Sequence, residues 1–473
     1  MANILLRKVS GDTMYSIIRT TPVYQDNFPY NPSVNYPEYD GELSEFNYAY
    51  DAVRESFISL GYDADNIGTP QWNPLKFLIN PGDTVFIKPN LVASQWRESC
   101  EYHGDLYSII THPSVIRAVA DYVTIALKGR GNMIIGDNPS IDADFNQLCE
   151  KTQLHRFSEL YDNCEVLDLR PHICDDLKNY GFKSKMKEQN GDPMGSTVVN
   201  LGKKSMFYGM NNKRFRGIYS KNKETKQHHT NDTHEYDISN SIYNADVYIS
   251  IPKLKTHRKV GTTLNLKGLV GINANKNYLV HWKSGYPSQG GDEFPEPVHK
   301  KSLFKRRIQL FLNKYLPEGF YHWIYKKTKS NIFQTEVSPE GQKHRGAWCG
   351  NDSCWRMVID LYEVFLRGRR TFSVVDGIIG GDGNGPFCPN TRKSGVIVSG
   401  PDLPTVDCIC TRLMGFDISE VKYLSYLNID CSNVKIVSNA YNTEDFFGSK
   451  DEYLSYNPPL HWDNLIKKGR ESI

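Results

Sequence analysis

The chain has 473 residues, with 56 Lys and Arg against 54 Asp and Glu, which gives a net charge of +2. This length allows two or three domains, and a hydrophobic content of 39% is enough for a sizeable core. Near-neutrality argues against a wholly basic nucleic-acid coat protein and an acidic tail protein, so no nucleic-acid partner is expected. The composition is that of an ordinary globular protein, in the size range of many enzymes.

Neither a membrane span nor a secretory signal is evident in the sequence. No stretch approaches the ~18 apolar residues of a spanning helix, and the apolar run before Arg7 is too short for a signal peptide. We therefore expect a cytoplasmic protein. None of the ten cysteines forms a C-x-x-C pair, which predicts free thiols in a reducing compartment and no ferredoxin-type iron–sulfur cluster.

The periodicity of the chain predicts alternating strands and helices. In chain order, the expected elements are a helix at 46–60, a strand at 84–88, a helix at 113–127, strands at 133–137, 245–252, 372–376 and 395–399, and a helix at 403–414. Pro113 suits the first turn of its helix, with Thr111 or His112 as N-cap. The strand–helix–strand order predicts a βαβ unit, and hence an α/β fold with mostly parallel strands, flanking helices and two α/β lobes.

Composition divides the chain into six segments. They are an N-terminal extension at 1–80, a first α/β unit at 81–175, a polar insertion at 176–240, a strand with basic and glycine-rich loops at 241–300, a basic amphipathic helical insertion at 301–345, and a C-terminal α/β unit at 346–473. Residues 300–329 carry nine Lys or Arg against one Glu. Such a segment predicts either a solvated helix face or a peripheral contact with the inner face of a membrane.

Polar residues follow the predicted strands where each strand ends, at the sheet edge where open α/β folds bind ligands. Lys88 and Asn90 end one strand, and His112 precedes a helix whose free N–H groups would point to the same region. This grouping suits a phosphate or carboxylate; the alternative is a surface lysine and a helix cap. Asp137 follows the next strand, where it would bind a sugar hydroxyl or a metal, or cap a turn.

A denser basic cluster follows the strand at 245–252. Lys253, Lys255, His257 and Lys267 lie within sixteen positions, and lysines in such places are seldom selected for packing because burying a charge is costly. We expect Lys253 to bind an anionic substrate. Lys255 and Lys267 are predicted to be catalytic as bases or nucleophiles, and His257 as a general acid or base. A solvated basic loop is the alternative.

Three further groups complete the candidate site. His281 is predicted to be catalytic and Trp282 to stack on a sugar ring, while Asn351 and Asp376 are expected to contact substrate. Asp292, Glu293 and Asp382 have the residue types of a divalent-metal site, although no tight ligand spacing supports one. The glycines at 380–385 predict a loop whose backbone N–H groups cradle phosphate.

Taken together, these clusters resemble the DUF362 family. The stretches that carry the resemblance are VFIKPNLV at 85–92, THPSVIRAV at 111–119, IIGDNP at 134–139, ADVYISIPKLKTH…NLKGLVG at 245–271 and FSVVDGIIGGDGNGP…MGFD at 372–417. The chain is most similar to the long branch of the family, which lacks the iron–sulfur module of other members. The stretches that indicate this branch are HWKSG, GGDEF and GAWCGND. The resemblance implies an α/β fold and a substrate from surface-polysaccharide metabolism. The chain also has a looser likeness to the nickel-pincer racemases.

The sequence thus predicts an enzyme that acts on a small anionic or sugar-like substrate through lysines and histidines at strand ends. Two alternatives remain open at this point. One is a non-catalytic assembly protein that contacts a membrane surface through 300–329, and the other is a metal-dependent or redox protein.

Overall fold

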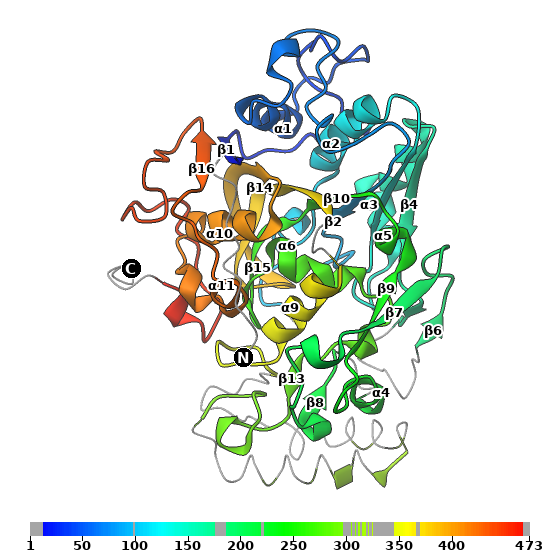
Figure 1. Ribbon diagram of the computed structural model, residues 1–473, viewed down its shortest axis with the longest axis vertical. Helices are drawn as coiled ribbons and strands as arrows, with labels where there is room; N and C mark the ends of the chain where they lie inside the picture. The colour runs from blue at the N-terminus through cyan, green and yellow to red at the C-terminus, as the bar shows by residue number, and fades with distance from the viewer. Residues whose placement is uncertain are drawn as a thin grey trace.

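The computed structural model describes residues 13–97, 100–175, 186–218, 222–296, 345–365 and 369–466, together with single positions between 304 and 324. Its centre is one ten-stranded, mostly parallel sheet (Figure 1). The strands are β1 (Met14–Arg19), β2 (Thr84–Pro89), β3 (Asn132–Asp137), β4 (Cys164–Asp168), β10 (Val247–Ile251), β11 (Lys253–His257), β12 (Gly261–Thr262), β14 (Arg370–Asn384), β15 (Cys388–Gly400) and β16 (Lys435–Ser438).

The strand order unites the two predicted α/β units in this one sheet. The order is β16-β1-β15-β14-β10-β2-β3-β4, with β11 pairing with β14 and β12. Strand β10 pairs in parallel with β2 on one side and β14 on the other. The predicted α/β fold is therefore confirmed, and the carboxyl ends of β2, β3 and β10 lie at one edge of the sheet.

The helices largely match the expected positions. They are α1 (Tyr48–Ser59), α2 (Pro113–Leu127), α3 (Phe145–Thr152), α4 (Asn222–Gln227), α5 (Asn240–Tyr243), α6 (Leu264–Gly268), α9 (Cys354–Phe365), α10 (Leu403–Leu413) and α11 (Lys422–Leu427). The predicted βαβ unit is β2–α2–β3, whose two strands are parallel neighbours. His112 is the N-cap of α2, where its Nδ1 accepts a hydrogen bond from the backbone N–H of Ser114 at 3.1 Å. Within the described ranges, every helix is too short or too polar to cross a bilayer.

Two hydrophobic cores lie on opposite faces of the sheet, because successive strand residues point to opposite sides. On β2, Val85 and Ile87 belong to the core that includes α1 and α2, whereas Phe86 belongs to the other core. On β10, Val247 and Tyr248 divide in the same way. The second core is formed by α6, α9 and α10, which Figure 1 shows in front of β14 and β15.

Short paired strands lie in the polar insertion and next to it in the sequence. Strand β7 (Ser196–Asn200) pairs with β9 (Glu235–Ser239), β8 (Phe215–Arg216) with β13 (Trp282–Lys283), and β5 (His172–Ile173) with β6 (Lys187–Glu188). In Figure 1, β8 and β13 lie below the central sheet, and β6, β7 and β9 lie at its lower right. The charged residues of the predicted basic helix at 300–329 lie outside the described residues, so that prediction is not tested.

Two expectations are wrong. The glycines at 380–384 are not a phosphate-binding loop but part of β14, which extends to Asn384. A Cβ on Gly380 would lie 2.9 Å from the carbonyl oxygen of Leu254, so the glycine permits the close approach of β11. Cys100 and Cys388 are not free thiols but form a disulfide with a Cα–Cα distance of 5.4 Å, while the other eight cysteines are free.

Candidate anion-binding site

The first part of the site lies where β2 and β3 end. Because these strands are parallel neighbours, their last residues meet at the same edge of the sheet. There Lys88 Nζ and Asp137 Oδ1 form a buried ion pair at 2.7 Å. The other oxygen of Asp137 accepts a hydrogen bond from the backbone N–H of Leu91 at 2.7 Å. Asn90 helps to anchor the same turn, since its backbone N–H donates to Thr111 Oγ1 at 2.9 Å.

Gly271 lies directly against this ion pair. A Cβ on Gly271 would be 2.2 Å from Asp137 Oδ1 and 2.7 Å from Lys88 Nζ. No side chain fits at such distances without displacing the pair. The segment that carries Lys267 therefore approaches the ends of β2 and β3 because position 271 is a glycine.

Strand β11 supplies the second part. Lys253, Lys255 and His257 alternate along the strand, so they project to the same side, and all three are buried. Lys255 Nζ donates to the carbonyl oxygens of Ile109 at 2.6 Å and Pro386 at 3.4 Å, and no carboxylate of the described residues forms an ion pair with it. Burial lowers the pKa of Lys255 well below its ordinary value, and the charges of Lys253, Lys267 and Lys88 lower it further.

Lys267 on α6 lies at the centre of the site. Its side chain belongs to a residue that is only 8% exposed, yet its ammonium group has no hydrogen-bond partner in the described part of the chain. Burial lowers its pKa. The charge of Lys267 contributes in turn to the lowered pKa values of Lys255, His257 and His281. The structure thus brings together four residues that the sequence predicted to be catalytic.

Two lysines that the sequence did not single out complete the group. Lys276 is buried, and its Nζ donates to the carbonyl oxygen of Asn138; burial, together with the charges of Lys88, Arg170 and Lys267, lowers its pKa to about 7. The half-buried Lys259 donates to the carbonyl oxygen of Arg345, and desolvation lowers its pKa to about 8. The lysine cluster is defined here as Lys88, Lys255, Lys259, Lys267 and Lys276. Lys259 could have been found from its place two residues after His257, whereas no local signal identifies Lys276.

His257 and His281 are neutral in this environment, with complementary ring nitrogens. Burial, reinforced by the charge of Lys267, lowers the pKa of both imidazoles well below the ordinary value. His257 Nδ1 accepts from the backbone N–H of Lys259 at 3.0 Å, so the neutral ring carries its proton on Nε2. His281 Nδ1 lies 3.2 Å from the carbonyl oxygen of Leu279, which can only accept, so its Nε2 is left as an acceptor. One ring can therefore donate a hydrogen bond, and the other can take up a proton.

Trp282 and Asp292 form one wall beside the lysine cluster. Lys259 Nζ lies 4.5 Å from the centre of the Trp282 ring, and the buried indole N–H of Trp282 has no hydrogen-bond partner among the residues that the structure describes. The Asp292 carboxylate accepts from the backbone N–H groups of Lys283 and Asp352, and from Ser353 Oγ at 2.6 Å. The hydrogen bonds of Asp292 thus hold the backbone at Lys283 and Asp352 together beside the lysine cluster.

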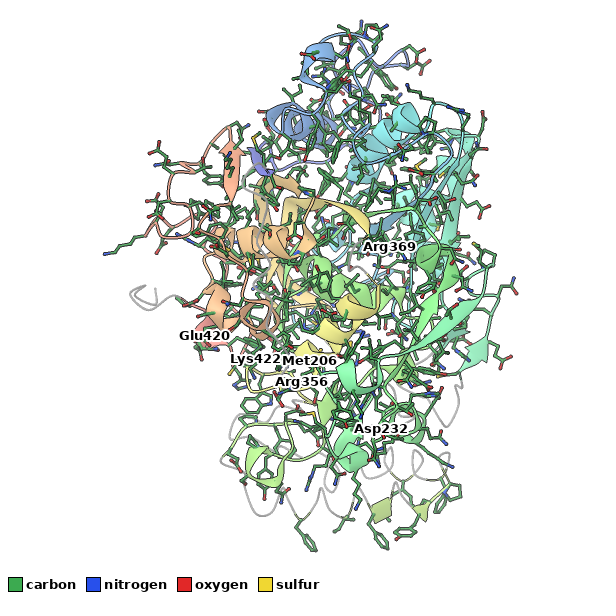
Figure 2. The ribbon with its side chains drawn as sticks, viewed as in Figure 1. Met206, Asp232, Arg356, Arg369, Glu420 and Lys422 are labelled. Carbon is green, nitrogen blue, oxygen red and sulfur yellow. A yellow bond between two sulfur atoms is a disulfide. The ribbon has the colours of Figure 1, made fainter. Side chains whose placement is uncertain are left out.

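Asn351 holds the start of α9. Its Oδ1 accepts from the backbone N–H of Cys354 at 2.8 Å, and its Nδ2 donates to the carbonyl oxygen of His281 at 3.1 Å. Figure 2 shows Met206, Arg356 and Lys422 in this region, where Arg356 Nη1 donates to the Met206 carbonyl oxygen at 3.4 Å and Lys422 Nζ to that of Asn351 at 3.0 Å. These contacts favour a positioning role for Asn351 over the predicted substrate contact.

Lys253, Asp376 and His112 form a separate closed network. Lys253 Nζ donates to Asp376 Oδ2 at 2.6 Å, to the Tyr24 hydroxyl at 2.9 Å and to the carbonyl oxygen of Ile379 at 3.1 Å. The His112 ring stacks on Tyr24 with centroids 3.9 Å apart, and its backbone N–H donates to Asp376. All three protons of the Lys253 ammonium are thus engaged within the protein, which favours a structural role over the predicted substrate contact.

The predicted metal ligands are engaged in different places. Asp382 accepts from the side chains of Asn390 at 3.2 Å and Asn457 at 3.0 Å, while Glu293 accepts from the backbone N–H of Gly285 at 3.2 Å. Among the described residues, no three His, Cys, Asp or Glu side chains are grouped so that they could hold a metal ion. A metal site stays a prediction.

Comparison with known proteins gives one family. The model of the family described as domain of unknown function (DUF362) matches residues 85–412, which include the whole lysine cluster, His257 and His281. No curated protein matches the chain.

Proposed function

Since this chain belongs to the DUF362 family, whose function is unknown, we propose that it is an enzyme acting on a small anionic or sugar-like substrate held by the lysine cluster. The observation that carries this proposal is the largely buried Lys267, which lies among other lysines and whose ammonium has no hydrogen-bond partner among the described residues. An isolated buried charge is costly, and a ligand of opposite charge is one of the few ways to offset it. Perturbed lysines that lie together at strand ends are typical of binding and catalytic sites.

The two histidines support an acid–base reaction. A substrate held by Lys267 would lie near His281 Nε2, which is free to accept a proton, and His257 Nε2–H, which can donate a hydrogen bond to a developing oxyanion. Both imidazoles are neutral at physiological pH because their pKa values are lowered by burial. Trp282 offers an aromatic face for a sugar ring, which agrees with a glycan-like substrate. Surface-polysaccharide metabolism would supply substrates of this kind.

The simplest test compares two lysines. We expect millimolar inorganic phosphate, at constant ionic strength, to raise the melting temperature of the wild type and of Lys203→Met, whose target lysine is exposed. Lys267→Met removes the central charge and should abolish this response. Equal responses in all three proteins would mean that phosphate binds elsewhere, and the proposal would fail.

For cofactors, the proposal requires neither an iron–sulfur cluster nor a bound metal. No two of the ten cysteines have C-x-x-C spacing, which supports membership of the branch without a ferredoxin-type module. A divalent metal held by Asp292, Glu293 or Asp382 remains an alternative. Elemental analysis of the purified protein would decide it, since a stoichiometric metal would favour metal-dependent or redox chemistry.

A second candidate function is peripheral contact with a membrane through 300–329. Phe304 and Phe311 are 66% and 62% exposed, and nine Lys or Arg lie in the same stretch of sequence. Exposed aromatic residues beside basic ones favour an anionic bilayer surface. Sedimentation with phosphatidylglycerol vesicles should carry down the wild type but not a Phe304→Ser, Phe311→Ser variant; sedimentation of both to the same extent would contradict this role.

A further inference from the structure

We propose that the group bound by the lysine cluster is a diphosphate, or a phosphate ester of similar charge, and not a single carboxylate. This inference rests on the proposed function of the site. The substrate class is thereby narrowed from anions in general to diphosphates and phosphate esters. The reason is that the site holds much positive charge, and carboxylates of the protein balance little of it.

The lysine cluster holds more positive charge than the carboxylates beside it balance. Five lysines form the cluster, and Asp137 and Asp292 are the carboxylates that act most strongly on them among the described residues. Asp137 is already bound to Lys88 and to two backbone N–H groups. Asp292 already accepts hydrogen bonds from the backbone N–H groups of Lys283 and Asp352 and from Ser353 Oγ. With every lysine protonated, these two carboxylates leave three of the five positive charges without a counter-charge, and a single carboxylate would balance only one of them.

The arrangement of the lysines also favours a phosphate chain. Lys88 ends β2, Lys255 lies on β11, Lys267 lies on α6, and Lys276 begins a short 3-10 helix at Lys276–Tyr278. The charges thus converge from four separate elements instead of forming a line on one exposed helix face. Lysines act as compact point charges, which suits the several oxygens of a phosphate chain, whereas a lone carboxylate is commonly bound by one bidentate arginine.

Two unsatisfied polar atoms lie next to the cluster. Within the described part of the chain, the buried Oδ1 of Asn138, whose backbone carbonyl accepts from Lys276, has no hydrogen-bond partner, and neither does the indole N–H of Trp282 beside Lys259. Buried polar atoms are rarely left in this state. The indole N–H can donate to a phosphate oxygen, whereas the Asn138 Oδ1 acceptor needs a donor, such as a hydroxyl group of a phosphate ester.

The binding of such a ligand should be linked to proton uptake. In the free protein, Lys276 has a pKa of about 7, so at pH 8 it is mostly neutral. A bound diphosphate would favour the charged forms of Lys276 and of Lys259, whose pKa is about 8, so that protons enter the site with the ligand. A carboxylate would produce a smaller effect, because its single charge is shared among five lysines.

Isothermal titration calorimetry of the full chain tests this inference. Inorganic pyrophosphate, inorganic phosphate and acetate are titrated at pH 8 and equal ionic strength, each in two buffers of different ionisation enthalpy. We expect pyrophosphate to bind at least tenfold more tightly than phosphate, acetate to bind most weakly, and pyrophosphate binding to be accompanied by net proton uptake. Lys267→Met should weaken pyrophosphate binding more than tenfold, and Lys203→Met should leave it unchanged.

The outcomes separate the two proposals. If acetate or phosphate binds as tightly as pyrophosphate through Lys267, the diphosphate inference is overturned and the anion-binding function survives. If none of the three anions binds, both proposals fail. Should Lys267→Met not fold, wild-type proton uptake decides, since pyrophosphate binding without uptake would overturn the inference.

Discussion

Removal of the Lys276 charge should make the ligand-free protein more stable near neutral pH. Burial lowers the pKa of this amine from its ordinary 10.5 to about 7, because the folded protein resists the charged form. Each pKa unit corresponds to about 1.4 kcal/mol, so keeping Lys276 in the folded state costs roughly 4 kcal/mol at pH 7. Lys276→Met removes this cost but also the hydrogen bond to the carbonyl of Asn138, a loss of about 1–3 kcal/mol. The expected net gain is about 1–3 kcal/mol.

The pH dependence is the sharper readout, because it does not depend on how the new methionine packs. Between pH 7 and pH 10.5 the unfolded chain keeps the Lys276 proton that the folded protein has released. The free energy of unfolding of the wild type therefore rises with pH through this window, by up to about 1.4 kcal/mol per pH unit. In Lys276→Met this contribution is absent, so the advantage of the variant should shrink as the pH rises.

Urea unfolding at pH 7.5, 8.5 and 9.5 in anion-poor buffer measures this difference. Lys203→Met is the matched control, because Lys203 is exposed and its removal should leave the slope unchanged. Parallel stability curves for the wild type and Lys276→Met would refute the reasoning, since they would show that Lys276 is not held in an unfavourable charged environment.

Three further variants probe the surroundings of the site. The double variant Cys100→Ser, Cys388→Ser should lower the stability of the oxidised protein by about 2–5 kcal/mol in urea unfolding, because the disulfide closes a long loop; no change would contradict a stabilising role. Asp376→Asn leaves Lys253 buried without its counter-charge and should cost roughly 3–5 kcal/mol, and a much smaller loss would show that the pair is dispensable. Gly271→Ala should weaken phosphate binding in calorimetry, because its Cβ would displace the ion pair at the end of β2; unchanged affinity would refute this.

Most of the fold was predictable from local sequence patterns. The apolar run at 84–88 and the proline-started helix at 113–127 were found because burial on both sheet faces and N-terminal capping leave clear local signals. The glycines at 380–384 wrongly predict a phosphate-binding loop, because glycine also permits two strands to approach closely. Only the position of the partner strand β11 shows which role applies. The disulfide was missed because its cysteines are 288 positions apart and no local pattern joins them.

Part of the site was also predictable from local sequence patterns. Lys255, His257 and Lys267 stand out because polar residues after a buried strand rarely serve packing. Lys276 could not be found, since its neighbours Asn138 and Lys88 are brought to it only by the tertiary fold. Sequence patterns also do not show which polar side chains pair with one another inside the folded protein. A strand-end lysine such as Lys253 looks the same whether a substrate or a buried aspartate balances its charge.

A crystal structure of the protein grown with inorganic pyrophosphate tests the central claim most directly. The account predicts phosphate density with oxygens within about 3 Å of Lys267 Nζ, the distance of a charge-assisted hydrogen bond. It also predicts that Lys255 and Lys276 lie at the same density. Pyrophosphate bound only at exposed lysines, with Lys267 still unpartnered, would contradict the claim that this cluster is an anion site.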